Sequence, residues 1–124
     1  ALSKKTPENM EYRRNLAVYE TERARAQIKL GRYDEAQIIA KKVIEMMIPI
    51  AEADKETTTY QYDLAIAYRL SAEAFAKRNN KTDAVESIKK AITLIEKLKE
   101  LNSLRDTDKD LIGELEKELA EYSK

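Results

Sequence analysis

The side chains that could do chemistry in this sequence are carboxylates, amines, guanidinium groups and tyrosine hydroxyls, because it contains no His and no Cys. The usual general base, the commonest metal ligand and the thiol nucleophile are therefore missing. With two Gly in 124 residues, the chain also lacks the glycine-rich loop that wraps phosphates. A di-iron helical bundle needs Glu-x-x-His pairs, which a chain without His cannot supply. We therefore expect no catalytic residue, no metal site and no cofactor.

The charged residues are balanced in sign and evenly spread. Lys and Arg total 23 and Asp and Glu total 23, so the net charge is zero. No basic stripe is present, so we expect no nucleic-acid partner and no binding to an anionic membrane. No apolar run is long enough to cross a bilayer, and no signal-peptide pattern opens the sequence. We expect a cytoplasmic protein.

The elements that must position these side chains are predicted to be helices. Hydrophobic residues make up 43% and charged residues 37% of the chain, with only two Gly and two Pro. So few turn residues exclude a many-stranded β fold. We expect one all-α domain over residues 1–124, with a frayed end at residues 1–5.

The first helical hairpin is predicted at about residues 7–53. Thr6-Pro7-Glu8 combines a capping hydroxyl, a proline and an acid, which is typical of a helix start. Gly31 can adopt the left-handed conformation that ends this helix, and Asp34 then places negative charge at the start of the next one. Pro49 should end or kink the second helix, and a kinked continuation to about residue 53 stays open. The first helix is expected to bury one apolar stripe. Its members are Met10, Leu16, Ala17, Tyr19, Ala24, Ile28 and Leu30.

The second hairpin is predicted at about residues 57–101, after a polar loop at 54–56. Thr57 is one of three consecutive threonines that could cap its first helix. Asn79 stands in for a C-terminal glycine, because Asn tolerates the left-handed region, and Thr82 is expected to cap the helix that follows. A polar break then precedes a fifth helix at about 107–122, with one apolar and one charged face. Such a helix suits the end of a helical array.

The two predicted hairpins are similar to each other when the chain is shifted by 48 residues, from Ala36 to Ala84. Small residues then match small residues, and Ala24 falls on Ala72. We infer two copies of one helical hairpin, in which these four alanines allow the helices to approach closely. The other matched pairs are Tyr33 with Lys81, Glu35 with Asp83, Ala40 with Ile88, Val43 with Ala91, Ile44 with Ile92 and Gln27 with Phe75.

This pattern resembles the tetratricopeptide repeat. The first copy matches the family at Ala24, Gly31, Tyr33, Ala36 and Val43, and the second at Tyr68, Ala72, Phe75, Ala84 and Ala91. The resemblance covers about residues 7–98, with the fifth helix as the cap. The sequence departs from the family in its spacing, since the standard repeat is roughly 34 residues long, and in Arg23, Gln27 and Asn79. An unrelated up-and-down helical bundle is the alternative fold.

The resemblance implies a binding groove, because the first helix of each tetratricopeptide repeat lines a concave surface that accepts a peptide or a partner helix. Carried onto this sequence, the groove residues are Thr21, Arg25, Ile28, Lys29, Arg69, Glu73, Ala76 and Lys77. Arg25, Arg69 and Lys77 could grip an acidic segment, although they could equally be ordinary solvated charges. Leu70 stands where the chaperone-binding members need Asn, so we expect no chaperone-tail receptor.

Tyrosines gather on the two predicted groove helices, and wet tyrosine hydroxyls are good anchors for partners. Tyr62 lies off the main apolar stripe and is a further groove candidate, whereas Tyr19 and Tyr68 are expected in the core. The resemblance implies a protein–protein or peptide-binding adaptor or scaffold, and not an enzyme. The alternative is self-association as a homodimer, or docking onto a larger protein. Two repeats bury little surface, so an apolar edge on the first or the last helix would favour this alternative.

Overall fold

The computed structural model describes residues 7–124 and consists of helices joined by short turns, with no strand in that range. This confirms the all-α prediction. The expected frayed end at residues 1–5 and the predicted cap Thr6 lie outside the described residues. The helices are α1 Pro7–Lys29, α2 Tyr33–Ala53, α3 Thr58–Lys77, α4 Lys81–Glu100 and α5 Leu111–Tyr122, with a short 3-10 helix η2 at Asp106–Asp108.

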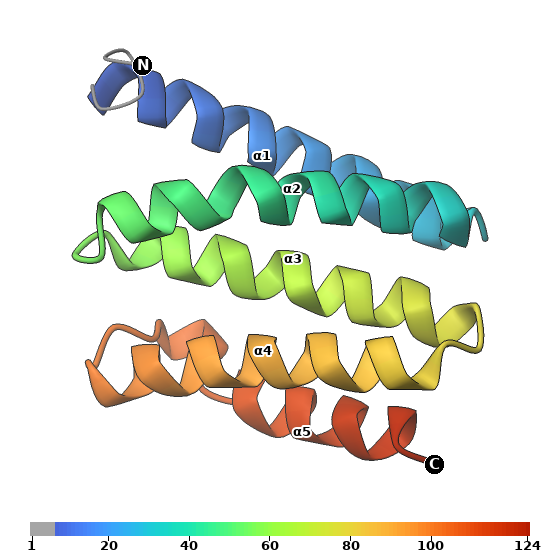
Figure 1. Ribbon diagram of the computed structural model, residues 1–124. Coiled ribbons are helices and arrows are strands. Elements are labelled where there is room, and N and C mark those ends of the chain that lie inside the picture. The colour runs from blue at the N-terminus through green and yellow to red at the C-terminus, as the bar shows by residue number, and fades with distance from the viewer. Residues whose placement is uncertain (1–6) are drawn as a thin grey trace.

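The first four helices run alternately in opposite directions as one row, and each packs on the next (Figure 1). Helix α3 lies inside the row between α2 and α4 and also touches α1. Helix α5 packs along α4 and closes the C-terminal end of the row (Figure 1). The arrangement is compatible with a helical repeat, because every helix rests mainly on its neighbours in sequence.

Three of the helices end in the same way. Gly31, Asn79 and Asn102 have positive φ angles of 78°, 63° and 54°, and the residue after each donates its N–H to a carbonyl five positions back. These hydrogen bonds are Arg32 to Gln27 at 2.8 Å, Asn80 to Phe75 at 2.9 Å and Ser103 to Leu98 at 2.9 Å. The pattern is the Schellman motif, which satisfies carbonyls at a helix end. The left-handed residue at the helix end was predicted at Gly31 and Asn79, whereas the one at Asn102 was not.

The structure decides one helix boundary that the prediction left open and corrects two others. Helix α2 continues through Pro49 to Ala53, which was one of the two outcomes left open. The predicted cap Thr82 is wrong, because Asn80 is the N-cap of α4 and its Oδ1 accepts the N–H of Asp83 at 3.2 Å. Because Asn79 forms the left-handed turn, the residue directly after it, Asn80, occupies the N-cap position of α4. The first four residues of the expected fifth helix lie instead in η2 and the turn that follows it.

The four alanines at matched positions, Ala24, Ala36, Ala72 and Ala84, are all fully buried, each with 0% exposure. The two hairpin turns also correspond at the same 48-residue shift, since Gly31 matches Asn79 in its positive φ. The core divides into two clusters, one shared by α1, α2 and α3 and one shared by α3, α4 and α5. The hairpins therefore agree in their turns and in the burial of these matched alanines.

The single buried stripe expected on α1 is wrong in part, because Leu16, Tyr19 and Leu30 are exposed by 37%, 62% and 64%. Tyr12 is also exposed. Tyr12, Leu16 and Tyr19 share one face of α1, and Leu30 directly follows the helix; we call these four residues the outer α1 stripe. Within residues 7–124, helix α1 lies at the edge of the row and packs on α2 and α3 from one side. At the 48-residue shift, Leu16 matches Leu64, which α3 buries in the core shared with α2. At this matched position, α3 therefore buries the face that α1 leaves exposed.

Candidate binding grooves

Five of the predicted groove residues line one cavity of about 300 Å³, the α1–α3 groove. Arg25, Ile28 and Lys29 come from one turn of α1, and Arg69 and Glu73 come from one turn of α3. Buried Ile66 and Leu70 complete its α3 side, and Glu118 reaches it from α5. Residues from helices that are about 40 positions apart in the sequence therefore share one site.

Three other predicted groove residues lie elsewhere. The Thr21 hydroxyl donates to the Ala17 carbonyl at 2.8 Å, within its own helix. Lys77 is exposed at the last position of α3 and does not line the cavity, and Ala76 does not line it either. Their place in the resemblance does not put them in the groove that this chain forms.

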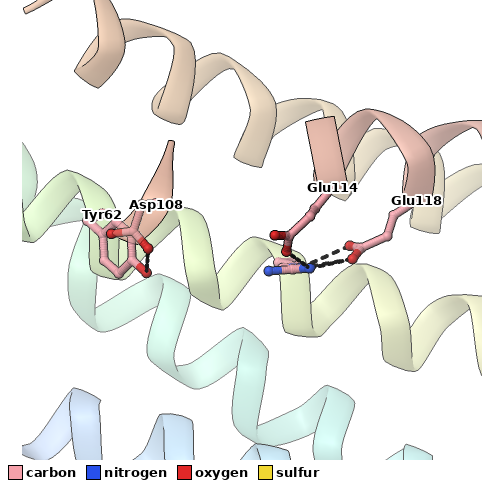
Figure 2. A network of polar contacts seen from close by, with 5 residues as sticks. Tyr62, Asp108, Glu114 and Glu118 are labelled. Atoms are coloured by element: carbon pink, nitrogen blue, oxygen red, sulfur yellow. Dashed lines mark hydrogen bonds and ion pairs between the residues drawn. The ribbon is translucent and has the colours of Figure 1, made fainter. Parts of the chain in front are cut away.

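Tyr62, the further groove candidate, holds the connection between α4 and α5. Its hydroxyl donates to Asp108 Oδ1 at 3.4 Å (Figure 2), and the guanidinium of Arg105 lies over its ring at 4.9 Å from the ring centre. Arg105 also donates to Asp108 at 2.9 Å. Tyr62 therefore fixes the start of α5 and lies away from the α1–α3 groove.

Arg69 is already engaged by carboxylates of its own chain. Its Nε donates to Glu118 at 3.0 Å and its Nη2 to the same carboxylate at 2.5 Å, while Glu114 accepts from Nη2 at 3.3 Å. Figure 2 shows Glu114 and Glu118 reaching from α5 toward α3. This bidentate bridge raises the pKa of the Arg69 guanidinium, with the hydrogen bond to Glu118 as the largest cause. The acidic segment that Arg69 contacts within residues 7–124 is α5, and its grip on an acidic partner stays a prediction.

The end of α5 packs close to the same bridge. Tyr122 packs against the core of α3, α4 and α5, and burial, followed by the charges of Glu118 and Glu73, raises its pKa to about 12. The α5 helix thus contributes Glu118 to one side of the α1–α3 groove and packs its apolar side chains against the core of α3, α4 and α5.

The cations that stay available in the α1–α3 groove are Arg25 and Lys29. Arg25 contacts Glu22 at 3.3 Å, but both side chains are exposed, so this pair contributes little. Lys29 makes no ion pair within the described part of the chain. The groove is therefore cationic along α1, apolar at its centre and acidic along α3 and α5.

A larger groove of about 630 Å³ lies between α2 and α4 and was not predicted. We call it the α2–α4 groove. Its apolar lining consists of Ile48, Ala51, Leu64, Tyr68, Leu94, Leu98 and Leu101. Lysines and two glutamates form its edge, namely Lys55, Lys89, Lys90, Lys97, Glu52 and Glu86. The sequence of one helix cannot show which other helix packs opposite it, so this groove could not be predicted.

The described residues offer two further observations on site chemistry. In residues 7–124, no group of three or more acidic side chains is placed to hold a metal ion. None of the helices in that range is long and apolar enough to pass through a lipid bilayer.

Helices α1 to α5 and their two grooves define an all-α array of consecutive, antiparallel helices. No family model matches the chain, and no curated protein and no solved structure matches it either.

Proposed function

We propose that this chain is a protein- or peptide-binding adaptor of the tetratricopeptide type, without catalytic activity, and that its ligand lies in the α1–α3 groove. The observation that carries this proposal is the single cavity shared by Arg25, Ile28, Lys29, Arg69 and Glu73. The resemblance singled out these residues as the groove, although they come from two separate helices. The matched burial of the four alanines supports the repeat on which the resemblance depends.

The chemistry of the groove favours a short segment with one apolar side chain and one acidic group. Ile28, Ile66 and Leu70 offer an apolar surface, and Arg25 and Lys29 offer cations at its α1 side. A volume of about 300 Å³ is at the small end for a binding pocket. It accommodates the side chains of a short peptide segment and leaves the rest of the partner outside.

The test is a peptide selected from a random display library against the wild-type chain, with its affinity measured by fluorescence anisotropy. Changing Arg25→Glu together with Lys29→Glu should weaken binding by about tenfold or more. Each exposed ion pair contributes up to about 1 kcal/mol, and charge reversal adds repulsion.

Two further variants complete this experiment. Changing Lys41→Glu together with Lys42→Glu makes the same change of charge on exposed residues outside both grooves, and should leave the affinity unchanged. Changing Glu118→Gln weakens the bridge to Arg69 and should tighten binding of an acidic peptide. Equal affinity in the Arg25/Lys29 variant and the wild type, with an unchanged circular dichroism spectrum, would remove the α1–α3 groove as the site.

A second candidate function is self-association through the outer α1 stripe. Tyr12, Leu16 and Tyr19 are large and exposed on α1, and Leu30 directly follows it, whereas the end of a helical array normally presents a polar face. We expect light scattering to show a dimer of the 14.3 kDa chain that dissociates on dilution. The variant Leu16→Glu with Tyr19→Glu should stay monomeric. A wild-type chain that is monomeric at every concentration would exclude this candidate.

A further inference from the structure

The α2–α4 groove has the shape that receives a helix. Helices α2 and α4 run in the same direction on either side of α3 (Figure 1), and the surface that is accessible in the groove is mostly apolar. The α4 lining extends from Glu86 to Leu101, which corresponds to about 22 Å at 1.5 Å per residue. That length corresponds to about four helical turns. An amphipathic helix binds in a groove of this kind with its apolar face against the apolar lining.

The groove is separate from the α1–α3 groove. Leu64 and Tyr68 line the α2–α4 groove, whereas Ile66, Leu70 and Glu73 line the α1–α3 groove. At 3.6 residues per turn these two sets point to opposite faces of α3. An occupant of one groove therefore does not compete for the residues of the other.

The edge of the α2–α4 groove has a local excess of positive charge, although the whole chain has none. Lys90 lies 3.6 Å from Glu86 and over the Tyr68 ring at 5.6 Å. Lys55, Lys89 and Lys97 make no ion pair within residues 7–124. Complementary charge on a partner would therefore be negative.

Gln61, on α3, also lines the groove and donates its Nε2 to the Ala51 carbonyl at 3.1 Å. Its Oε1 is buried and has no hydrogen-bond partner among the described residues. Because that oxygen is not accessible, the charge of the edge, and not Gln61, indicates the chemistry of an occupant.

We propose that the α2–α4 groove binds an acidic amphipathic helix of a partner protein, with leucine-like side chains over Leu94 and Leu98 and carboxylates beside Lys89 and Lys97. Four turns of lining favour a helix over a compact ligand, and the lysine edge selects its charge. This site goes beyond the proposed function, because it does not use Arg25 or Lys29.

The probe is a synthetic helical peptide of about 15 residues, with Leu at steps of three and four and Glu on both flanks. A control peptide keeps the leucines and carries Lys in place of Glu. By fluorescence anisotropy at low salt we expect the acidic peptide to bind at least about tenfold more tightly than the basic one. The difference should shrink as salt is added, since salt screens exposed charges. Amide shift changes in nuclear magnetic resonance spectra should fall on α2, on α4 and on the Gln61–Tyr68 face of α3.

Two pairs of variants locate the peptide. Lys89→Glu with Lys97→Glu should weaken binding about tenfold or more, and Lys41→Glu with Lys42→Glu should not change it. Leu101 and Leu30 are both exposed leucines that follow the last residue of a helix, but only Leu101 lines the groove. Leu101→Ala should therefore weaken binding severalfold, while Leu30→Ala should leave it unchanged.

Several outcomes would overturn the proposal. They are equal binding of the acidic and basic peptides, an unchanged affinity in the Lys89/Lys97 variant, and shift changes centred on Arg25 and Lys29. Displacement of the peptide by sodium oleate at stoichiometric concentration, with oleate alone producing the α2 and α4 shifts, would assign the groove to an anionic amphiphile instead. The α1–α3 groove is tested with variants of Arg25 and Lys29, and the α2–α4 groove with variants of Lys89 and Lys97. Either proposal can therefore be rejected while the other stands.

Discussion

Replacing Ile88 with Ala is expected to lower the free energy of unfolding by about 3 kcal/mol, within the usual range for an isoleucine truncated in a core. Ile88 is fully buried, with 0% exposure, in the cluster shared by α3, α4 and α5. The loss combines the transfer free energy of the removed carbons with the cost of the cavity that they leave. Urea unfolding followed by circular dichroism at 222 nm measures it.

The matched control is Ile38→Ala, which makes the same chemical change on α2. Ile38 is 69% exposed, so the expected change is within about 0.5 kcal/mol. Since whole domains are stable by about 5–15 kcal/mol, the two variants should differ clearly in their urea midpoints. Equal midpoints would mean that α4 does not bury Ile88 in solution.

The second large effect concerns the buried alanines at the start of each hairpin's second helix. Ala36→Leu and Ala84→Leu should each lower the free energy of unfolding by about 2 kcal/mol or more, because the added carbons have no space and must push helices apart. Both alanines have 0% exposure. Similar losses at the two positions are expected if the hairpins are copies of one unit.

Ala26→Leu on α1 is the control for this pair. Ala26 is exposed in the last turn of α1, and Leu and Ala have similar helix propensities, so stability should change by less than about 0.5 kcal/mol. A small effect at position 36 or 84 would contradict close helix packing there. It would also weaken the repeat from which the binding proposal starts.

The α5 helix has two roles: it covers the core, and it contributes an acidic side chain to the α1–α3 groove. It covers the α3–α4 core through Leu111 and Leu115, which are buried, as expected of a capping helix. It also places Glu118 against Arg69 at the edge of the α1–α3 groove. Under the proposed function, an acidic partner therefore meets a groove whose central arginine is already neutralised, and Arg25 and Lys29 contribute the attraction.

Features set by neighbouring residues in the chain could be predicted from the sequence. The left-handed turns at Gly31 and Asn79 follow from residues that tolerate positive φ. The buried alanines followed from their repetition at a constant shift. Thr82 was the exception, because Asn80 and Thr82 can both cap a helix and only the turn geometry selects between them.

Features that depend on which other helix packs against a given face could not be predicted from the sequence. The α1 sequence has apolar residues on two faces, and only its position at the edge of the row determines that Tyr19 and Leu30 face outward. Arg69 and Glu118 are 49 residues apart, and no local pattern pairs them. The α2–α4 groove likewise exists only because α2 and α4 flank the same face of α3.

By itself, the sequence determined an all-α fold, the approximate bounds of its helices, the two matched hairpins and the residues of α1 and α3 that could share a groove. Helix periodicity, capping and turn preferences act over a few residues, so one chain segment contains that information. The tertiary structure alone decided which apolar faces are covered, that α5 occupies Arg69, and that a lysine-edged groove opens on the other face of α3. Those outcomes depend on contacts between distant segments, because the free energy of burying a side chain depends on what packs against it.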